Sequence, residues 1–337
     1  MSRAHYRNQL GGFLGDVKSG CLVGLGHFKW LVTKTLAPLV GYSESDESLR
    51  QDFSNEGLKV IGVGYGRTGT YSLGLALDEL GYPTLHTQHL YETGEIFDHL
   101  VDNIFLKSIE ENRVVEAEPD FDLLLKGGYV ATVDLPFALY FEQIRDQYPD
   151  CKFVLTTRED SETWFRSWNV MTSSITQPAQ YASSLFTHVK KLEYYMRYLF
   201  ATVNDDKEFL TSPWPLPPQN KEKAIASYEK HNQLVRDTIP PSHLLEYNVR
   251  QGWGPLCKFL EVSDASCPTT PFPKSNSARA VKWQSYSSFI GPPILASLIM
   301  LIVFSGSLRR IRSAVDWFCH QRSRILQLVS KGKGKDS

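Results

Sequence analysis

Short apolar runs alternate along the chain with longer stretches in which apolar residues recur at helical spacing. The short runs predict strands over residues 58–63, 82–86, 129–133, 152–157 and 243–249. The longer stretches predict helices over residues 70–80, 95–111, 161–171, 184–203, 220–238 and 252–260. One more predicted helix follows the third strand and ends near residue 147.

Strands that alternate with helices are joined by crossover connections, which produce a mostly parallel sheet with helices on its faces. We therefore predict a three-layer α/β domain. In such sheets ligands bind beyond the C-terminal ends of the strands. Three connections place polar residues there: the glycine-rich residues 64–72, Asp134, and residues 158–167.

The same patterning divides the chain into four parts. Residues 56–280 carry the predicted domain, and residues 1–55 form an N-terminal extension that could be amphipathic. Residues 286–308 contain an apolar run of about 20 residues, the length needed to cross a bilayer. We predict a transmembrane or membrane-associated helix there, with a buried core helix as the alternative. The basic tail, residues 309–337, would flank this C-terminal membrane anchor, and the main domain would be cytosolic.

The net charge and the cysteine content reduce the number of possible protein classes further. The net charge of −1 gives no electrostatic reason to expect a nucleic-acid partner. The chain has five cysteines, which is an odd number, and no two of them form a CxxC pair. We therefore predict buried free thiols in a reducing compartment, rather than a disulfide framework or a zinc site.

The strongest chemical signal is the segment between the first predicted strand and its helix. It reads Gly64-Tyr65-Gly66-Arg67-Thr68-Gly69-Thr70-Tyr71-Ser72. Glycines let a backbone approach an anion closely, and a helix start offers unpaired N–H groups and the positive end of the helix dipole. The segment is typical of a phosphate-binding loop and makes the predicted sheet P-loop-like.

Two familiar phosphate loops fit this segment incompletely. Gly64, Gly66 and Gly69 match the dinucleotide-binding fingerprint, but no acidic residue stands at the end of the second strand to bind a ribose. A nucleotide-triphosphatase loop needs a lysine after its last glycine, and this chain has Thr70 there. Each of these two loop types would therefore lack one residue that normally contacts its nucleotide.

The segment resembles the 5′-phosphosulfate loop of sulfotransferases, in which a cation precedes a Ser/Thr-Gly-Thr turn. Here Arg67 precedes Thr68-Gly69-Thr70, although lysine is common at that place. Residues 228–232, 244–247, 252–260 and 271–276 extend the resemblance, which covers about residues 58–276.

The resemblance implies roles for other residues. Arg158 and a serine would hold the 3′-phosphate of 3′-phosphoadenosine 5′-phosphosulfate (PAPS). In the family this serine usually follows the arginine by eight residues, which would be Arg166 here. We therefore assume a one-residue insertion between them and assign the role to Ser167, with Arg166 as the alternative. Asp134 stands in Asp-Leu-Pro where many relatives have His-Leu-Pro, and it would be the general base.

Two residues complete the predicted site. His86, after the second strand, could orient the acceptor or replace Asp134 as the base, and Lys274 is a candidate cofactor contact. The predicted cofactor-binding residues are thus Gly66, Arg67, Thr68, Gly69, Thr70, Tyr71, Ser72, Arg158, Ser167 and Lys274, and the catalytic residues are Asp134, Arg67 and His86.

The implied reaction is transfer of a sulfuryl group from PAPS to a hydroxyl or amine of a small-molecule acceptor, without a metal ion. A magnesium-holding aspartate at position 134 is the rival interpretation of that residue, as in nucleotide-dependent kinases. A kinase of P-loop fold and a non-catalytic, membrane-anchored nucleotide-binding protein are therefore the alternative functions.

Overall fold

The computed structural model describes residues 51–273, apart from 91–92, 116, 118, 183–186 and 214–215, and within them five strands form one parallel sheet. The strands are β1 (Val60–Gly62), β2 (Thr84–His86), β3 (Ala131–Val133), β4 (Lys152–Thr156) and β5 (Leu244–Tyr247). Their spatial order is β2-β3-β1-β4-β5, and each neighbouring pair is parallel. This confirms the predicted parallel α/β sheet.

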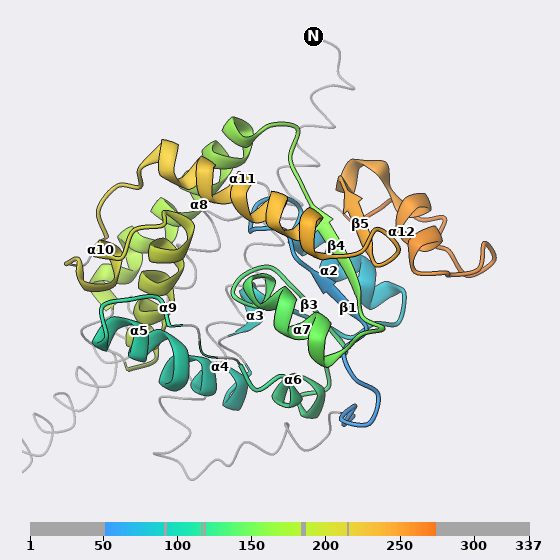
Figure 1. The fold of residues 1–337 in the computed structure, drawn as a ribbon, viewed down its shortest axis with the longest axis horizontal. Coiled ribbons are helices and arrows are strands. Elements are labelled where there is room, and N and C mark those ends of the chain that lie inside the picture. The colour runs from blue at the N-terminus through green and yellow to red at the C-terminus, as the bar shows by residue number, and fades with distance from the viewer. Residues whose placement is uncertain are drawn as a thin grey trace, which may run out of the picture. The chain divides into compact units, whose positions relative to one another are not determined.

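Successive strand residues point to opposite faces of the sheet, where separate groups of helices cover them (Figure 1). On one face Ile61 and Phe153 pack in a core that includes residues of α7, α8, α9 and α11. On the other face Val60 and Val154 pack with residues of α2 and α12. The sheet is therefore the middle of three layers.

The longer helices match the predicted positions. They are α2 (Thr70–Glu79), α4 (Glu95–Leu100), α7 (Phe141–Gln147), α8 (Ser161–Ala182), α9 (Thr187–Val203), α11 (Lys221–Thr238) and α12 (Trp253–Phe259). The predicted helix 95–111 continues from α4 through a π-helical segment η2 (Val101–Phe105) into α5 (Leu106–Glu110). Helix α8 extends beyond the predicted end at residue 171.

Short elements were not predicted from the sequence. They are α3 (Thr87–Leu90), α6 (Asp122–Lys126), α10 (Glu208–Thr211) and the 3₁₀ turn η4 (Val249–Gln251), whereas the 3₁₀ turn η3 (Phe137–Tyr140) begins the helix predicted after the third strand. Each has at most five residues, too few for the spacing of apolar positions to show a period.

The cysteine prediction was wrong for one pair. Cys257 and Cys267 form a disulfide, with their Cα atoms 5.9 Å apart. Helix α12 ends at Phe259, the amide of Val262 bonds back to the carbonyl of Cys257, and the chain reverses direction. This turn brings the two cysteines together, and their sequence spacing alone did not indicate it. Cys151 is a buried free thiol, as expected.

Several predicted features lie outside the described residues. They are the predicted membrane helix, the basic tail, Lys274 and nearly all of the N-terminal extension. Among the residues that are described, no helix is both long enough and apolar enough to cross a bilayer. The membrane anchor stays a prediction.

Candidate active site

The C-terminal ends of β1, β3 and β4 bring the three predicted polar segments together. A side chain on Gly66, after β1, would place its Cβ 2.9 Å from the Oδ1 atom of Asp134, after β3. The Nε of Arg158, after β4, donates to the carbonyl oxygen of Arg67 at 2.7 Å. Because β1 lies between β3 and β4, its loop touches both neighbours.

The glycine-rich loop depends on close backbone contacts. A Cβ on Gly64 would lie 2.2 Å from Thr156 Oγ1 and 2.5 Å from the carbonyl oxygen of Thr156. Gly69 has φ +112°, a conformation that residues with a side chain rarely adopt. These two positions therefore require glycine for different reasons, one for space and one for backbone conformation.

Replacing Gly64 with alanine is expected to lower the free energy of unfolding by about 3 kcal/mol or more, beyond the usual cost of overpacking. The clash is partly with backbone atoms of β4, which a side-chain rotation cannot relieve. Chemical denaturation measures the change. Gly254→Ala is the control, because nothing lies within 4 Å of its added Cβ. Equal stability of the two variants would contradict the close approach of loop and strand.

Thr68 faces the protein rather than the open end of the loop. Its hydroxyl donates to the carbonyl oxygen of Tyr65 at 2.7 Å and lies 2.6 Å from the hydroxyl of Thr156. Both threonines are buried. Thr68 therefore fastens the loop to β4, and Thr156 is a supporting residue that sequence reasoning missed.

The first turn of α2 is open to an anion. Gly69 is its N-cap and supplies no side chain, and the first turn contains no acidic residue. The N–H groups of Thr70, Tyr71 and Ser72 precede the first intrahelical bond, which runs from Leu73 to Gly69. These groups and the helix dipole favour negative charge at this end.

Two arginine side chains converge on the loop. Burial, and then the neighbouring guanidinium of Arg158, lower the pKa of Arg67 to about 10, while Asp134 acts in the opposite direction. Arg67 therefore remains protonated at neutral pH. Two positively charged side chains at one loop favour the binding of an anion.

Ser167, rather than Arg166, faces this group of cations. The Nε of Arg67 donates to the hydroxyl of Ser167 at 3.2 Å. Arg166 is exposed, and its guanidinium bonds to Thr163 one turn earlier on the outside of α8. Of the two alternatives left open by the sequence, Ser167 is the one placed beside the loop.

Asp134 is buried among hydrogen-bond donors. Its Oδ1 accepts from the backbone N–H of Leu135 at 2.7 Å, and its Oδ2 accepts from the hydroxyl of Thr70 at 3.0 Å. The Nε2 of His86 lies 3.2 Å from the same Oδ2. The structure thus brings Asp134, His86 and the start of α2 into direct contact.

Two aromatic side chains support the loop from the helical layer. The indole N–H of Trp164 donates to the carbonyl oxygen of Gly66 at 3.0 Å. The ring of Tyr228 stacks on Trp164 at a centroid distance of 4.2 Å, and its hydroxyl accepts from the backbone N–H of Arg158. Neither contact was predicted, because 98 residues separate Gly66 from Trp164 and 70 separate Arg158 from Tyr228.

His231 fixes the end of β1. Its Nε2 lies 2.7 Å from the carbonyl oxygen of Val63, and its ring stacks on Tyr65 at 4.4 Å. Burial lowers the pKa of His231 to about 4, so the ring is neutral and donates to that carbonyl. This histidine supports the loop structurally. It lies in the segment 228–232 that extends the family resemblance, but its contact with β1 was not predicted.

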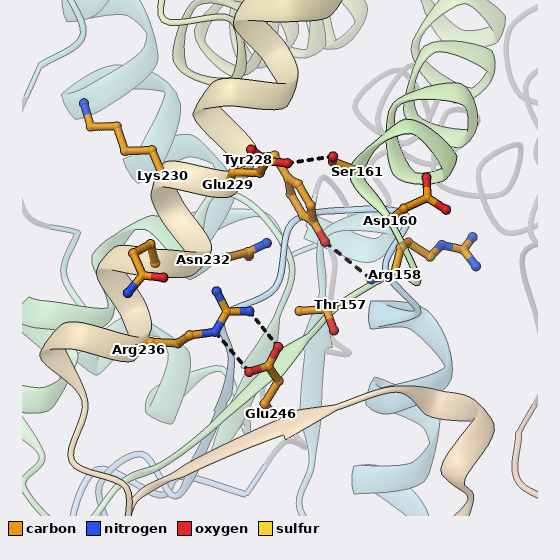
Figure 2. Close-up of a pocket in the computed structure, with 11 residues that line it drawn as sticks. Thr157, Arg158, Asp160, Ser161, Tyr228, Glu229, Lys230, Asn232, Arg236 and Glu246 are labelled. Carbon is orange, nitrogen blue, oxygen red and sulfur yellow. Dashed lines mark hydrogen bonds and ion pairs between the residues drawn. The ribbon is translucent and has the colours of Figure 1, made fainter.

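A pocket of about 450 Å³ lies beside Arg158, between α11, the start of α8 and the end of β4 (Figure 2). A bidentate ion pair between Arg236 and Glu246 occupies one side of it, and Ser161 donates to Glu229 on another. Figure 2 shows the guanidinium of Arg158 pointing away from the Arg236–Glu246 pair. The cationic group is therefore directed toward the loop and not into this pocket.

Metal ligands are not grouped within the described part of the chain. No set of three or more histidine, cysteine, aspartate or glutamate side chains is arranged there to hold an ion.

Comparisons with known proteins agree with this site. A family model described as a sulfotransferase domain matches residues 59–281. The Ava biosynthesis cluster protein M of Aspergillus versicolor is 30% identical over 225 residues, which cover 64% of this chain and 80% of that protein. The matched residues contain the whole sheet and the loop, Asp134 and Arg158. The chain therefore belongs to the sulfotransferase family.

Proposed function

We propose that this protein transfers the sulfuryl group of PAPS to a hydroxyl or amine of a small-molecule acceptor. Membership of the family supports a sulfotransfer reaction. The observation that carries the choice of donor is the pair of guanidinium groups at one uncapped helix start. PAPS has phosphate groups at both its 5′ and 3′ ends, and two separate cations suit such a ligand.

Each part of the site has a role in this proposal. The first N–H groups of α2 and Arg67 bind the 5′-phosphosulfate. Arg158 and Ser167 bind the 3′-phosphate. Gly66 and Gly69 keep side chains away from the place where the donor approaches the backbone.

Asp134 accepts the proton of the acceptor while the new bond to sulfur forms. The bond between sulfur and the bridging phosphate oxygen breaks, and its electron pair leaves with 3′,5′-bisphosphoadenosine (PAP). Arg67 stabilises the charge that develops on that leaving group. Preorganised donors of this kind reduce the barrier because they need no rearrangement during the reaction.

Selective binding of PAP tests the donor. The wild type is expected to bind PAP far more tightly than ADP, which lacks the 3′-phosphate. Arg158→Ala is expected to remove most of that difference, about 1.5–3 kcal/mol for hydrogen bonds to a charged group. Calorimetry with PAP, ADP, ATP and NAD in parallel measures it.

Arg166→Ala is the matched control, because this exposed arginine lies on the same helix as Ser167 and bonds only within the helix. It should leave the selectivity intact. Equal affinity of the wild type for PAP and ADP would rule out PAPS as the donor, and tighter binding of ATP would favour the kinase alternative.

A further inference from the structure

The imidazole ring of His86 is held in one tautomer. Its Nδ1 accepts a hydrogen bond from the backbone N–H of Gln88 at 2.9 Å. An imidazole nitrogen that accepts from an amide carries no proton, so the ring proton resides on Nε2. The ring of Tyr71 meets the imidazole edge to face at 4.9 Å and restricts its plane.

The Nε2 atom of His86 lies beside the proposed base and the Thr70 hydroxyl. It lies 3.2 Å from Asp134 Oδ2 and 3.3 Å from the hydroxyl oxygen of Thr70. The hydroxyl of Thr70 donates a hydrogen bond to the same Oδ2 at 3.0 Å. His86 and Asp134 are both less than 10% exposed, so water competes little for these bonds.

These contacts distinguish the two carboxylate oxygens. An ionised carboxylate has about four lone-pair sites. Oδ2 accepts from the Thr70 hydroxyl and has His86 Nε2 3.2 Å away, while Oδ1 accepts from the backbone N–H of Leu135 alone among the described residues. Oδ1 is also the oxygen nearer the phosphate loop, at 2.9 Å from an added Gly66 Cβ against 3.5 Å for Oδ2.

We propose that His86 is a positioning residue, whose Nε2–H holds the Thr70 hydroxyl oriented toward Asp134 Oδ2 and leaves Oδ1 to take the proton of the acceptor. The role of Asp134 as base rests on the proposed function. His86 itself cannot serve as base in this arrangement, because its unprotonated Nδ1 faces the backbone of Gln88. This assignment replaces the sequence-based option in which His86 takes the proton.

The first experiment needs no substrate. Long-range ¹H–¹⁵N correlation spectra of the wild type, labelled with ¹⁵N-histidine, report which ring nitrogen of each histidine is protonated. The His86 signals are identified by their loss in His86→Gln. We expect the ring to carry a proton on Nε2 and none on Nδ1, which accepts from the backbone of Gln88. A ring protonated on Nδ1, or on both nitrogens, would overturn the proposal whether or not PAPS is the donor.

The second experiment separates positioning from proton transfer. A panel of phenols, alcohols and amines is first tested with the wild type. The acceptor that gives the most PAP is then used for all variants. His86→Ala is expected to lower kcat by up to about 10²-fold, the cost of misplacing a reacting group by about 1 Å, with the KM for PAPS unchanged. His86→Gln should recover most of the rate, because its amide can place an N–H donor near the position of Nε2.

The outcomes of the kinetic test differ for the two assignments. If His86→Gln is as slow as His86→Ala while both bind PAP normally, the hydrogen bond from residue 86 to Thr70 is not what matters and the proposal fails. If the wild type does not bind PAP, the proposed function fails instead, and the tautomer measurement still decides the arrangement of His86.

Discussion

Asp134→Asn is expected to lower turnover by about 10²–10⁴-fold, the usual contribution of a general base. The amide has nearly the same shape as the carboxylate but cannot take a proton. Its nitrogen replaces one of the two oxygens, which accept from Leu135 and Thr70, so stability should fall moderately. PAP formation from PAPS, with the acceptor chosen on the wild type, measures turnover, and calorimetry measures PAP binding.

Asp160→Asn is the control for the loss of a carboxylate at this edge of the sheet. Asp160 accepts from the backbone N–H of Thr163 at the start of α8, a role that asparagine also fills. Its turnover should match that of the wild type. An active Asp134→Asn variant would mean that the proton leaves the acceptor by another route, and Asp134 would then be only a structural residue.

Arg67→Ala is expected to lower turnover by about 10²–10³-fold, as removal of a donor to developing negative charge does. Its effect on PAP affinity should be smaller, because the charge on the leaving phosphate is greatest as the bond to sulfur breaks. The pKa of Arg67, about 10, keeps the group charged at the pH of such assays. Turnover and PAP affinity are measured on the same preparations.

Arg67→Lys is the comparison that separates charge from shape. Lysine keeps the positive charge but loses the planar group that reaches Ser167. Partial activity in the lysine variant, with little in the alanine variant, is the expected result. A large loss of PAP binding in Arg67→Ala with unchanged turnover would show that Arg67 binds the donor but does not act on the reaction.

The sheet could be predicted from the sequence because its three central strands, β1, β3 and β4, are short, mostly apolar and buried on both faces. All five predicted strands are present, each one to three residues shorter at its ends. Helix α8 was predicted to end at residue 171, where serines, threonines and Pro178 follow, yet it continues to Ala182. The helix thus continues through a segment of low local helix propensity, which is only a weak guide to where a helix ends.

The site could be predicted only in part. Arg67, Asp134 and Arg158 could be predicted to lie near one another, because each follows a strand and parallel strands end at the same edge of a sheet. The inward orientation of Thr68 could not be predicted, since it depends on Thr156, 88 residues away. The contact of His231 with Val63 spans 168 residues. Such contacts arise from packing between distant segments, which leaves no local pattern.

The neighbouring guanidinium groups of Arg67 and Arg158 also matter before any donor arrives. Their mutual repulsion is a cost that the folded protein carries whenever the site holds no anion. A doubly charged ligand cancels this repulsion, so part of its binding free energy comes from relief of a cost already present. Small anions in solution provide the same relief less completely. An anionic donor at this edge of the sheet is therefore expected to bind less tightly as the salt concentration rises, because salt screens its attraction to the two guanidinium groups.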